Sequence, residues 1–250
     1  MRFAALVPVT GGDSAADIAR ALGSIRAQTW ADVAIYVYYS GPANAAVDQV
    51  LAPFAAAPDC QVLRNPALCS AAMARNALMD AAGEHVHAFL DSDDEWLPQH
   101  LADFAALYAD LDPDWQTDTA NCFYFTDYRQ RQSQRHVRFG PPQRRLSYLL
   151  RQPVLLSSVI TARLKLEFPA IRAEDFAFSH AALQTAGRVI HNPEIRVIYD
   201  QQRRRHKGIG FKIRRTFRLM DHIVENKPAA LGLTLVFLTR FLWRTGARKK

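Results

Sequence analysis

The amino-acid sequence predicts an α/β fold in which helices flank a mixed, mainly parallel sheet. Along the first 130 residues, short apolar runs alternate with amphipathic segments, which is the pattern of βαβ units. A length of 250 residues with 49% apolar residues is sufficient for one large core and an appendage. The strands predicted in this part are Phe3–Pro8, Val33–Tyr39, Gln61–Arg64 and Val86–Asp91, and the helices between them are Ser14–Gln28, Ala45–Ala57 and Ser70–Ala82.

Apolar residues recur at three- and four-residue spacing in each of these helices, and Ile18, Leu22 and Ile25 share one face of the first. The segment Arg131–Arg145 is polar, basic and interrupted by glycine and proline, which predicts a mobile loop. A glycine, Gly187, ends the last helix. The remaining predicted elements are helices at Pro98–Asp110 and Glu174–Ala186 and strands at Asn121–Arg129, Ser157–Ala162 and Arg188–Asp200.

The charge is divided unevenly along the chain. Residues 1–128 carry 5 Lys or Arg and 17 Asp or Glu, whereas residues 129–250 carry 26 and 7. Two amphipathic stretches near the end, Ile209–Asn226 and Ala229–Arg244, are flanked by basic runs and are too short in apolar length to cross a bilayer. A solvated charged face would explain this pattern, and so would peripheral binding to an anionic membrane.

The most informative stretch is Ala88–Pro98, in which an apolar strand leads into the acidic turn Asp91-Ser92-Asp93-Asp94-Glu95. Strands of a parallel sheet present ligand-binding loops at their carboxyl ends. Two carboxylates one residue apart, Asp91 and Asp93, suit Mg²⁺ or Mn²⁺, which would offset the charge of a diphosphate leaving group. The alternative is an acidic turn that only caps the next helix, whose dipole favours Asp and Glu.

Three motifs in this order resemble the family-two glycosyltransferases, an inverting group with the GT-A fold. Ala19–Thr29 is similar to their first helix, Ala74-Arg75-Asn76-Ala77-Leu78 to their Ala-Arg-Asn helix, and Phe89–Pro98 to their Asp-x-Asp segment. The resemblance extends over residues 3 to 200. It implies a Rossmann-like GT-A domain at residues 1–205, followed by a helical basic tail at residues 206–250. It also implies transfer of a sugar from a nucleotide-sugar donor, with a UDP-sugar expected, to an acceptor hydroxyl.

The resemblance assigns roles to particular residues. Asp93 would be the main metal ligand, and Asp91 would assist it and face the donor. In Glu174-Asp175, Asp175 would be the catalytic base and Glu174 a supporting acid, although N-capping of the following helix is the structural alternative. The remaining residues expected at the donor are Pro8, Val9, Thr10, Ser40, Arg75 and Ser92, with His206 as a further candidate at the metal.

Two motifs depart from the family pattern. The family has Pro-x-Tyr-Asn after the first strand where this chain has Pro8-Val9-Thr10-Gly11, and an Asp-Asp-Gly-Ser pattern after the second where this chain has Tyr39-Ser40-Gly41-Pro42. Both departures fall in the expected nucleotide pocket, where Tyr38 or Tyr39 could stack on a base or be buried strand residues. A degenerate nucleotide-sugar-binding protein therefore remains an alternative. A nucleotidyltransferase is a second one, because that class can share a similar sheet and metal chemistry.

The cellular setting follows from the same features. Three cysteines without a metal-ligand spacing favour a reducing compartment, so we expect a cytoplasmic protein. The basic tail adds the expectation that it lies peripherally on the inner face of the cytoplasmic membrane. The resemblance and the basic tail imply an acceptor that is a saccharide or a lipid-linked molecule of surface polysaccharide or lipopolysaccharide assembly. The isoelectric point near 9.5 would also suit a nucleic-acid binder, but the acidic first half and the absence of a binding motif argue against that class.

Overall fold

A computed structural model describes residues 1–83, 85–111, 121–140, 142 and 154–200 of the chain. The predicted tail at 206–250, with its two amphipathic stretches and His206, lies outside these residues, as does part of the predicted loop after Arg131. None of the described helices combines the length and hydropathy that a membrane crossing requires.

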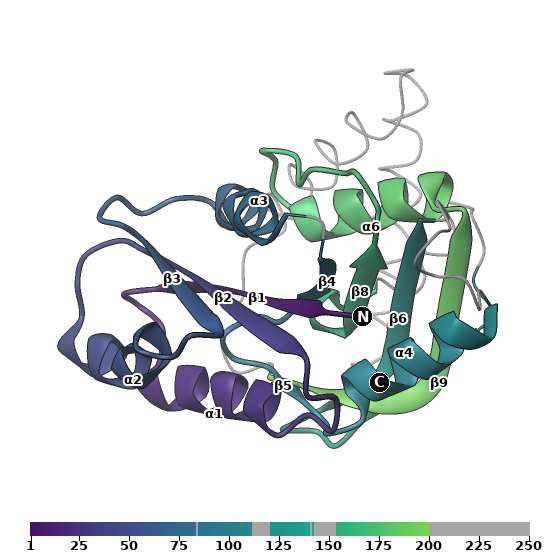
Figure 1. Ribbon diagram of the computed structural model, residues 1–250, viewed down its shortest axis with the longest axis horizontal. Coiled ribbons are helices and arrows are strands. Elements are labelled where there is room, and N and C mark those ends of the chain that lie inside the picture. The colour runs from purple at the N-terminus through teal and green to yellow at the C-terminus, as the bar shows by residue number, and fades with distance from the viewer. Residues whose placement is uncertain (84, 112–120, 141, 143–153, 201–250) are drawn as a thin grey trace, which may run out of the picture.

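The strands form one mixed sheet in the order β3-β2-β1-β4-β8-β6-β9-β5, with β7 paired to β6 (Figure 1). Strands β1 to β4 run parallel, whereas β8 is antiparallel to both β4 and β6. The long pair β6 and β9 is parallel, and the two-residue strands β5 and β7 pair antiparallel to β9 and β6. The strands are β1 (Phe3–Thr10), β2 (Val33–Ser40), β3 (Cys60–Asn65), β4 (Val86–Phe89), β5 (Glu95–Trp96), β6 (Cys122–Gln130), β7 (His136–Val137), β8 (Val159–Ala162) and β9 (Arg188–Tyr199).

Helices cover both faces of the sheet. In Figure 1, α3 and α6 lie above it and α1, α2 and α4 below it. The predicted apolar face of α1 is buried at Ile18, Leu22 and Ile25, and the Ser14 side chain caps this helix by accepting a hydrogen bond from the Asp17 amide. The helices are α1 (Ala15–Arg26), α2 (Ala45–Ala55), α3 (Ala71–Ala82), α4 (His100–Leu111) and α6 (Glu174–Thr185), with a short 3₁₀ helix, η1 (Leu156–Ser158).

Three local predictions were wrong. Strand β4 ends at Phe89 rather than Asp91, so Asp91, Asp93 and Asp94 lie in the turn beyond it and Glu95 begins β5. The predicted strand from Ser157 begins as η1, and the predicted loop after Arg131 contains β7. Strand β5 was not predicted at all. Strands of two residues carry no periodicity, and they exist here because longer strands supply their hydrogen-bond partners.

Candidate active site

A pocket lies where three parallel strands end at one edge of the sheet. Thr10 at the end of β1 is in register with Ser40 at the end of β2, and β4 runs parallel to β1 on its other side. The described residues enclose about 200 Å³ there. The lining includes every expected donor residue and both expected metal ligands, namely Pro8, Val9, Thr10, Ser40, Arg75, Asp91, Ser92 and Asp93, and five residues that were not predicted, Asp13, Cys69, Ser70, Ala71 and Ala74.

A larger hollow of about 330 Å³ lies near the starts of β1 and β4. Met1, Arg2, His85 and Arg163 are among its lining residues, and it contains none of the residues that the sequence singled out. The residues predicted for the donor and the metal therefore line the smaller pocket.

Arg75 of α3 joins the two acidic motifs. Its Nη2 donates to Asp91 Oδ1 over 2.7 Å, and its Nη1 donates to Glu174 Oε1 over 3.0 Å. The side chain is only 7% exposed, and its guanidinium carbon lies 5.4 Å from the ring centroid of Phe168. Burial opposes the charge, but the attraction of Asp91 and Glu174 outweighs it, so the pKa of Arg75 is raised. Arg75 is therefore a buried residue of the site and not an exposed surface arginine of α3.

The first part of the acidic turn is anchored to the loop after β1. Ser92 Oγ donates to Asp13 Oδ2 over 3.0 Å, and the same carboxylate oxygen accepts the Thr10 amide over 2.8 Å. The carbonyl oxygen of Asp93 accepts a hydrogen bond of 2.9 Å from Arg20 of α1. Asp13 thus belongs to the site through its contact with Ser92, and no motif identified it beforehand.

Asp94, in contrast, is part of the core. It is fully buried, and its carboxylate accepts hydrogen bonds from Ser157 Oγ and from the Asp200 amide, the latter over 2.9 Å. Burial, followed by the nearby charge of Asp91, raises the pKa of Asp94 well above its ordinary value. Ser157 Oγ also accepts the Asp91 amide over 3.1 Å, so the turn is fixed to the segment before β8. Asp94 is therefore a structural residue of the turn.

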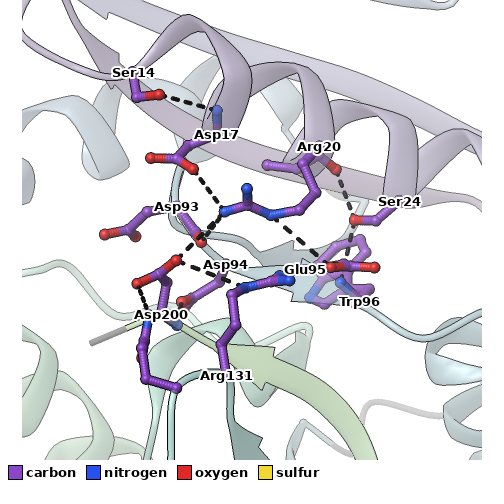
Figure 2. A network of polar contacts seen from close by, with 12 residues as sticks. Ser14, Asp17, Arg20, Ser24, Asp93, Asp94, Glu95, Trp96, Arg131 and Asp200 are labelled. Carbon is purple, nitrogen blue, oxygen red and sulfur yellow. Dashed lines mark hydrogen bonds and ion pairs between the residues drawn. The ribbon is translucent and has the colours of Figure 1, made fainter. Parts of the chain in front are cut away.

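Arg20 and Arg131 form ion pairs with acidic residues around the turn (Figure 2). Arg20 forms an ion pair of 2.8 Å with Asp17 and a longer one of 3.7 Å with Asp200. Arg131, which follows β6, pairs with Glu95 over 2.6 Å and with the same Asp200 over 3.6 Å. The end of β9 and the start of α1 are thereby connected through the acidic turn.

The second acidic pair opens α6. Glu174 and Asp175 are the first two residues of this helix, and the capping residue before them is Ala173, with φ 74° and no side-chain cap hydrogen bond. N-capping by Asp175 or Glu174 is therefore wrong. The charge of Asp175 makes the smallest contribution to the raised pKa of Arg75, and neither Glu174 nor Asp175 is among the residues that line the pocket. A left-handed alanine costs about 1–3 kcal/mol, and such strain is commonly retained at functional sites.

The pocket could bind a divalent ion only if a ligand supplied part of the coordination shell. Asp91 and Asp93 bring two carboxylates to it, but the described residues contain no group of three His, Cys, Asp or Glu arranged around one point. One oxygen of Asp91 is already bonded to Arg75. Mg²⁺ commonly binds through one or two carboxylates and completes its shell with water and substrate phosphates. The donor set fits that mode and not an all-protein cage.

The two loops that depart from the family pattern pack against each other. A Cβ at Gly11 would lie 2.2 Å from the Pro42 carbonyl oxygen, so only glycine fits at this close approach. Asn44 Nδ2 donates to the Gly11 carbonyl over 2.8 Å, and the Tyr39 hydroxyl accepts the Asn44 amide over the same distance. Tyr39 is buried, and neither it nor the half-buried Tyr38 lines the pocket. The interpretation of buried strand tyrosines therefore fits better than base stacking.

The sequence model of glycosyl transferase family 2 matches residues 5–162 of this chain. The chain belongs to that family. It is a glycosyltransferase, as the motifs and the pocket at the strand ends indicated. Among proteins of curated function, none matches the chain closely enough in sequence to count as a relative.

Solved structures share the fold. S. aureus TarS residues 1–349, in complex with UDP-GlcNAc, is 17% identical, with a TM-score of 0.67 over 97% of this chain and 73% of TarS 1–349. A longer S. aureus TarS structure is also 17% identical and has a TM-score of 0.64. The match covers 97% of this chain and 44% of that TarS chain. The mannosyltransferase PcManGT from Pyrobaculum calidifontis, in complex with GDP-Man and Mn²⁺, is 16% identical, with a TM-score of 0.59 over 99% of this chain and 79% of PcManGT. The predicted GT-A fold is confirmed.

Proposed function

We propose that this glycosyltransferase transfers a sugar, with inversion, from a nucleoside diphosphate sugar to an acceptor hydroxyl. The observation that carries the proposal is the bridge through Arg75, which connects Asp91 in the pocket with Glu174 beside Asp175. An inverting displacement needs a base on the side of the anomeric carbon opposite the leaving group. The joining of the two acidic motifs across one arginine supports Asp175 as that base.

In this mechanism Asp175 accepts the proton of the acceptor hydroxyl while the acceptor oxygen attacks the anomeric carbon. The bond from that carbon to the diphosphate breaks, and the nucleoside diphosphate leaves with the bonding electrons. Asp93 and Asp91 would hold Mg²⁺ or Mn²⁺, which when bound offsets charge on the diphosphate. Arg75 keeps Asp91 and Glu174 at a fixed separation. The donor is proposed to be a UDP-sugar, in support of which TarS binds UDP-GlcNAc, although PcManGT binds GDP-Man.

The test compares Asp93→Asn and Asp175→Asn with Asp80→Asn, an exposed carboxylate of α3 outside the pocket. Release of nucleoside diphosphate from a panel of donors and sugar acceptors is followed with and without Mn²⁺. Loss of a general base costs about 10²–10⁴ in rate, so Asp175→Asn should fall by that factor while Asp80→Asn keeps full activity. Asp93→Asn should require far more Mn²⁺. Wild-type rates in both site variants would refute the assignment.

The two alternative functions give different results in the same experiment. A degenerate protein would bind the donor, seen as a raised melting temperature, and would release no diphosphate with any acceptor. A nucleotidyltransferase would instead form pyrophosphate from a nucleoside triphosphate and a sugar phosphate.

The acceptor is proposed to be a saccharide or a lipid-linked molecule of surface polysaccharide or lipopolysaccharide assembly, reached from the inner face of the cytoplasmic membrane. The basic residues between 201 and 250 support this placement, because clustered Lys and Arg bind anionic lipid. Sedimentation with anionic and neutral vesicles, at low and high salt, tests it. Binding to neither vesicle type would remove the membrane from the proposal.

A further inference from the structure

We propose that Arg20 is a positioning residue of the active site. It fixes the main chain at Asp93 so that the Asp93 carboxylate meets a divalent ion bound together with the diphosphate. The inference rests on the proposed function, because it assumes that Asp93 is a metal ligand. Arg20 belongs to α1 and is not among the residues that line the pocket, so it acts through the acidic turn.

The peptide unit between Asp93 and Asp94 is hydrogen-bonded on both sides. Its carbonyl oxygen accepts a bond of 2.9 Å from Arg20 Nη2, and its amide donates to the Asp91 carbonyl oxygen over 3.1 Å. A peptide unit is planar and rigid, so these two bonds fix its orientation. In Figure 2 the Asp93 carboxylate points to the side opposite the Arg20 guanidinium. The fixed peptide therefore limits the directions that this carboxylate can take.

Arg20 is itself held in place for this contact. Its Nη2 carries two hydrogens and also lies 2.8 Å from Asp17 Oδ1, one turn earlier on α1. The same nitrogen is 3.7 Å from Asp200 Oδ2, just after β9, and Nε is 3.9 Å from Glu95 Oε2. These two distances are too long for hydrogen bonds, so they add attraction without fixing geometry. The donor to the turn is therefore carried by a helix whose apolar face is buried.

The position of Asp93 matters because few other groups can replace it. Of the two carboxylates proposed to hold the ion, Asp91 already has one oxygen bonded to Arg75. Groups that orient a metal ligand without touching the ion commonly account for about 10- to 100-fold in metal affinity. A displaced Asp93 would therefore leave the ion poorly coordinated.

The charge of Arg20 makes the sign of the effect diagnostic. A cation near the metal repels Mn²⁺, so removal of the charge alone should strengthen Mn²⁺ binding. Loss of the bond to the Asp93 carbonyl should weaken it. Arg131 is the matched comparison, because it is a second cation beside the turn whose ion pairs, with Glu95 and Asp200, are to side chains.

The experiment measures the Mn²⁺ enhancement, defined as the dissociation constant of UDP without Mn²⁺ divided by that with saturating Mn²⁺. Calorimetry gives both constants for the full chain, and GDP replaces UDP if UDP does not bind. The enhancement reports Mn²⁺ affinity because the two ligands are thermodynamically linked. We expect Arg20→Met to lower it about tenfold, at the low end of the range because the Arg20 side chain is 28% exposed. Arg131→Met should keep or increase it.

A purely structural role of Arg20 would lower the melting temperature without changing the enhancement. Arg20→Gln replaces Arg20→Met if the methionine variant does not fold. An unchanged or larger enhancement in the Arg20 variant, or an equal loss in Arg131→Met, would overturn the inference.

Asp93→Asn separates this inference from the proposed function. If Asp93→Asn loses the enhancement and Arg20→Met keeps it, only the role of Arg20 fails. If Asp93→Asn keeps the full enhancement, or the wild type shows none with either nucleotide, the proposed metal role of Asp93 fails instead.

Discussion

Replacing Arg75 by lysine should uncouple the two acidic motifs without removing the charge between them. Arg75 uses two different nitrogens for Asp91 and Glu174, at 2.7 and 3.0 Å, and a single ammonium cannot hold both carboxylates in the same geometry. The variant therefore loses one charge-assisted hydrogen bond, worth about 1.5–3 kcal/mol. If the whole of this loss appears in the transition state, kcat/KM falls about 10- to 150-fold.

The assay is steady-state kinetics with the best donor found, with kcat and KM determined separately for wild type and Arg75→Lys. We expect both a raised donor KM, because Asp91 moves, and a lowered kcat, because the helix that carries Asp175 is less well placed. Arg26→Lys is the matched control, since Arg26 also makes two bonds to one acid, Asp59, on the exposed surface. A value of kcat/KM within threefold of wild type in Arg75→Lys would refute the bridge as a functional element.

Two further predictions concern single side chains. His100 is fully buried with no hydrogen-bond partner for either ring nitrogen within the described residues, and burial, with a smaller effect of Arg196, lowers its pKa to about 3. In the unfolded chain the His100 imidazole becomes protonated as the pH falls below about 6.5, whereas in the folded chain it stays neutral. The free energy of unfolding of the wild type should therefore fall by about 2 kcal/mol between pH 6.5 and 5. Urea unfolding at both pH values should show that His100→Phe does not lose this stability. An equal loss in the variant and the wild type would contradict the assignment to His100. The second prediction concerns the cysteines. Burial raises the pKa of Cys60 to about 11 and of Cys122 to about 12, so at pH 8 a maleimide should label mainly Cys69. A nucleoside diphosphate with Mn²⁺ should slow this labelling, because Cys69 lines the pocket, and an unchanged rate would exclude binding there.

The parallel half of the fold could be predicted because its signals are local. The strands β1 and β2 are nearly continuous apolar runs, and each intervening helix has a regular apolar face, such as Ile18, Leu22 and Ile25 in α1. The carboxyl ends of such strands share an edge, which is why residues as distant as Thr10, Ser40 and Asp91 could be expected at one pocket.

The pairing of long-range polar groups could not be predicted in the same way. Arg75 was expected at the donor, yet two of its nitrogens donate to carboxylates 16 and 99 residues away in sequence. Ser157, which accepts the Asp91 amide and donates to Asp94, belongs to no motif, and its position depends on β8 running antiparallel beside β4. Such contacts follow from the complete topology and leave no periodic trace in the sequence.

The four acidic residues between Asp91 and Glu95 look equivalent in sequence, but their surroundings give them different roles. Asp94 is buried among hydrogen-bond donors, and Glu95 is paired with Arg131 on the side away from the pocket, so both fix the shape of the turn. Asp91 and Asp93 line the pocket, where a bound cation and a diphosphate would meet them. Four carboxylates within five residues repel one another unless cations lie nearby. Arg20, Arg75 and Arg131, which contact this segment, supply the opposite charge. We therefore expect a substitution of Asp94 to change the stability of the turn and one of Asp93 to change what the pocket binds.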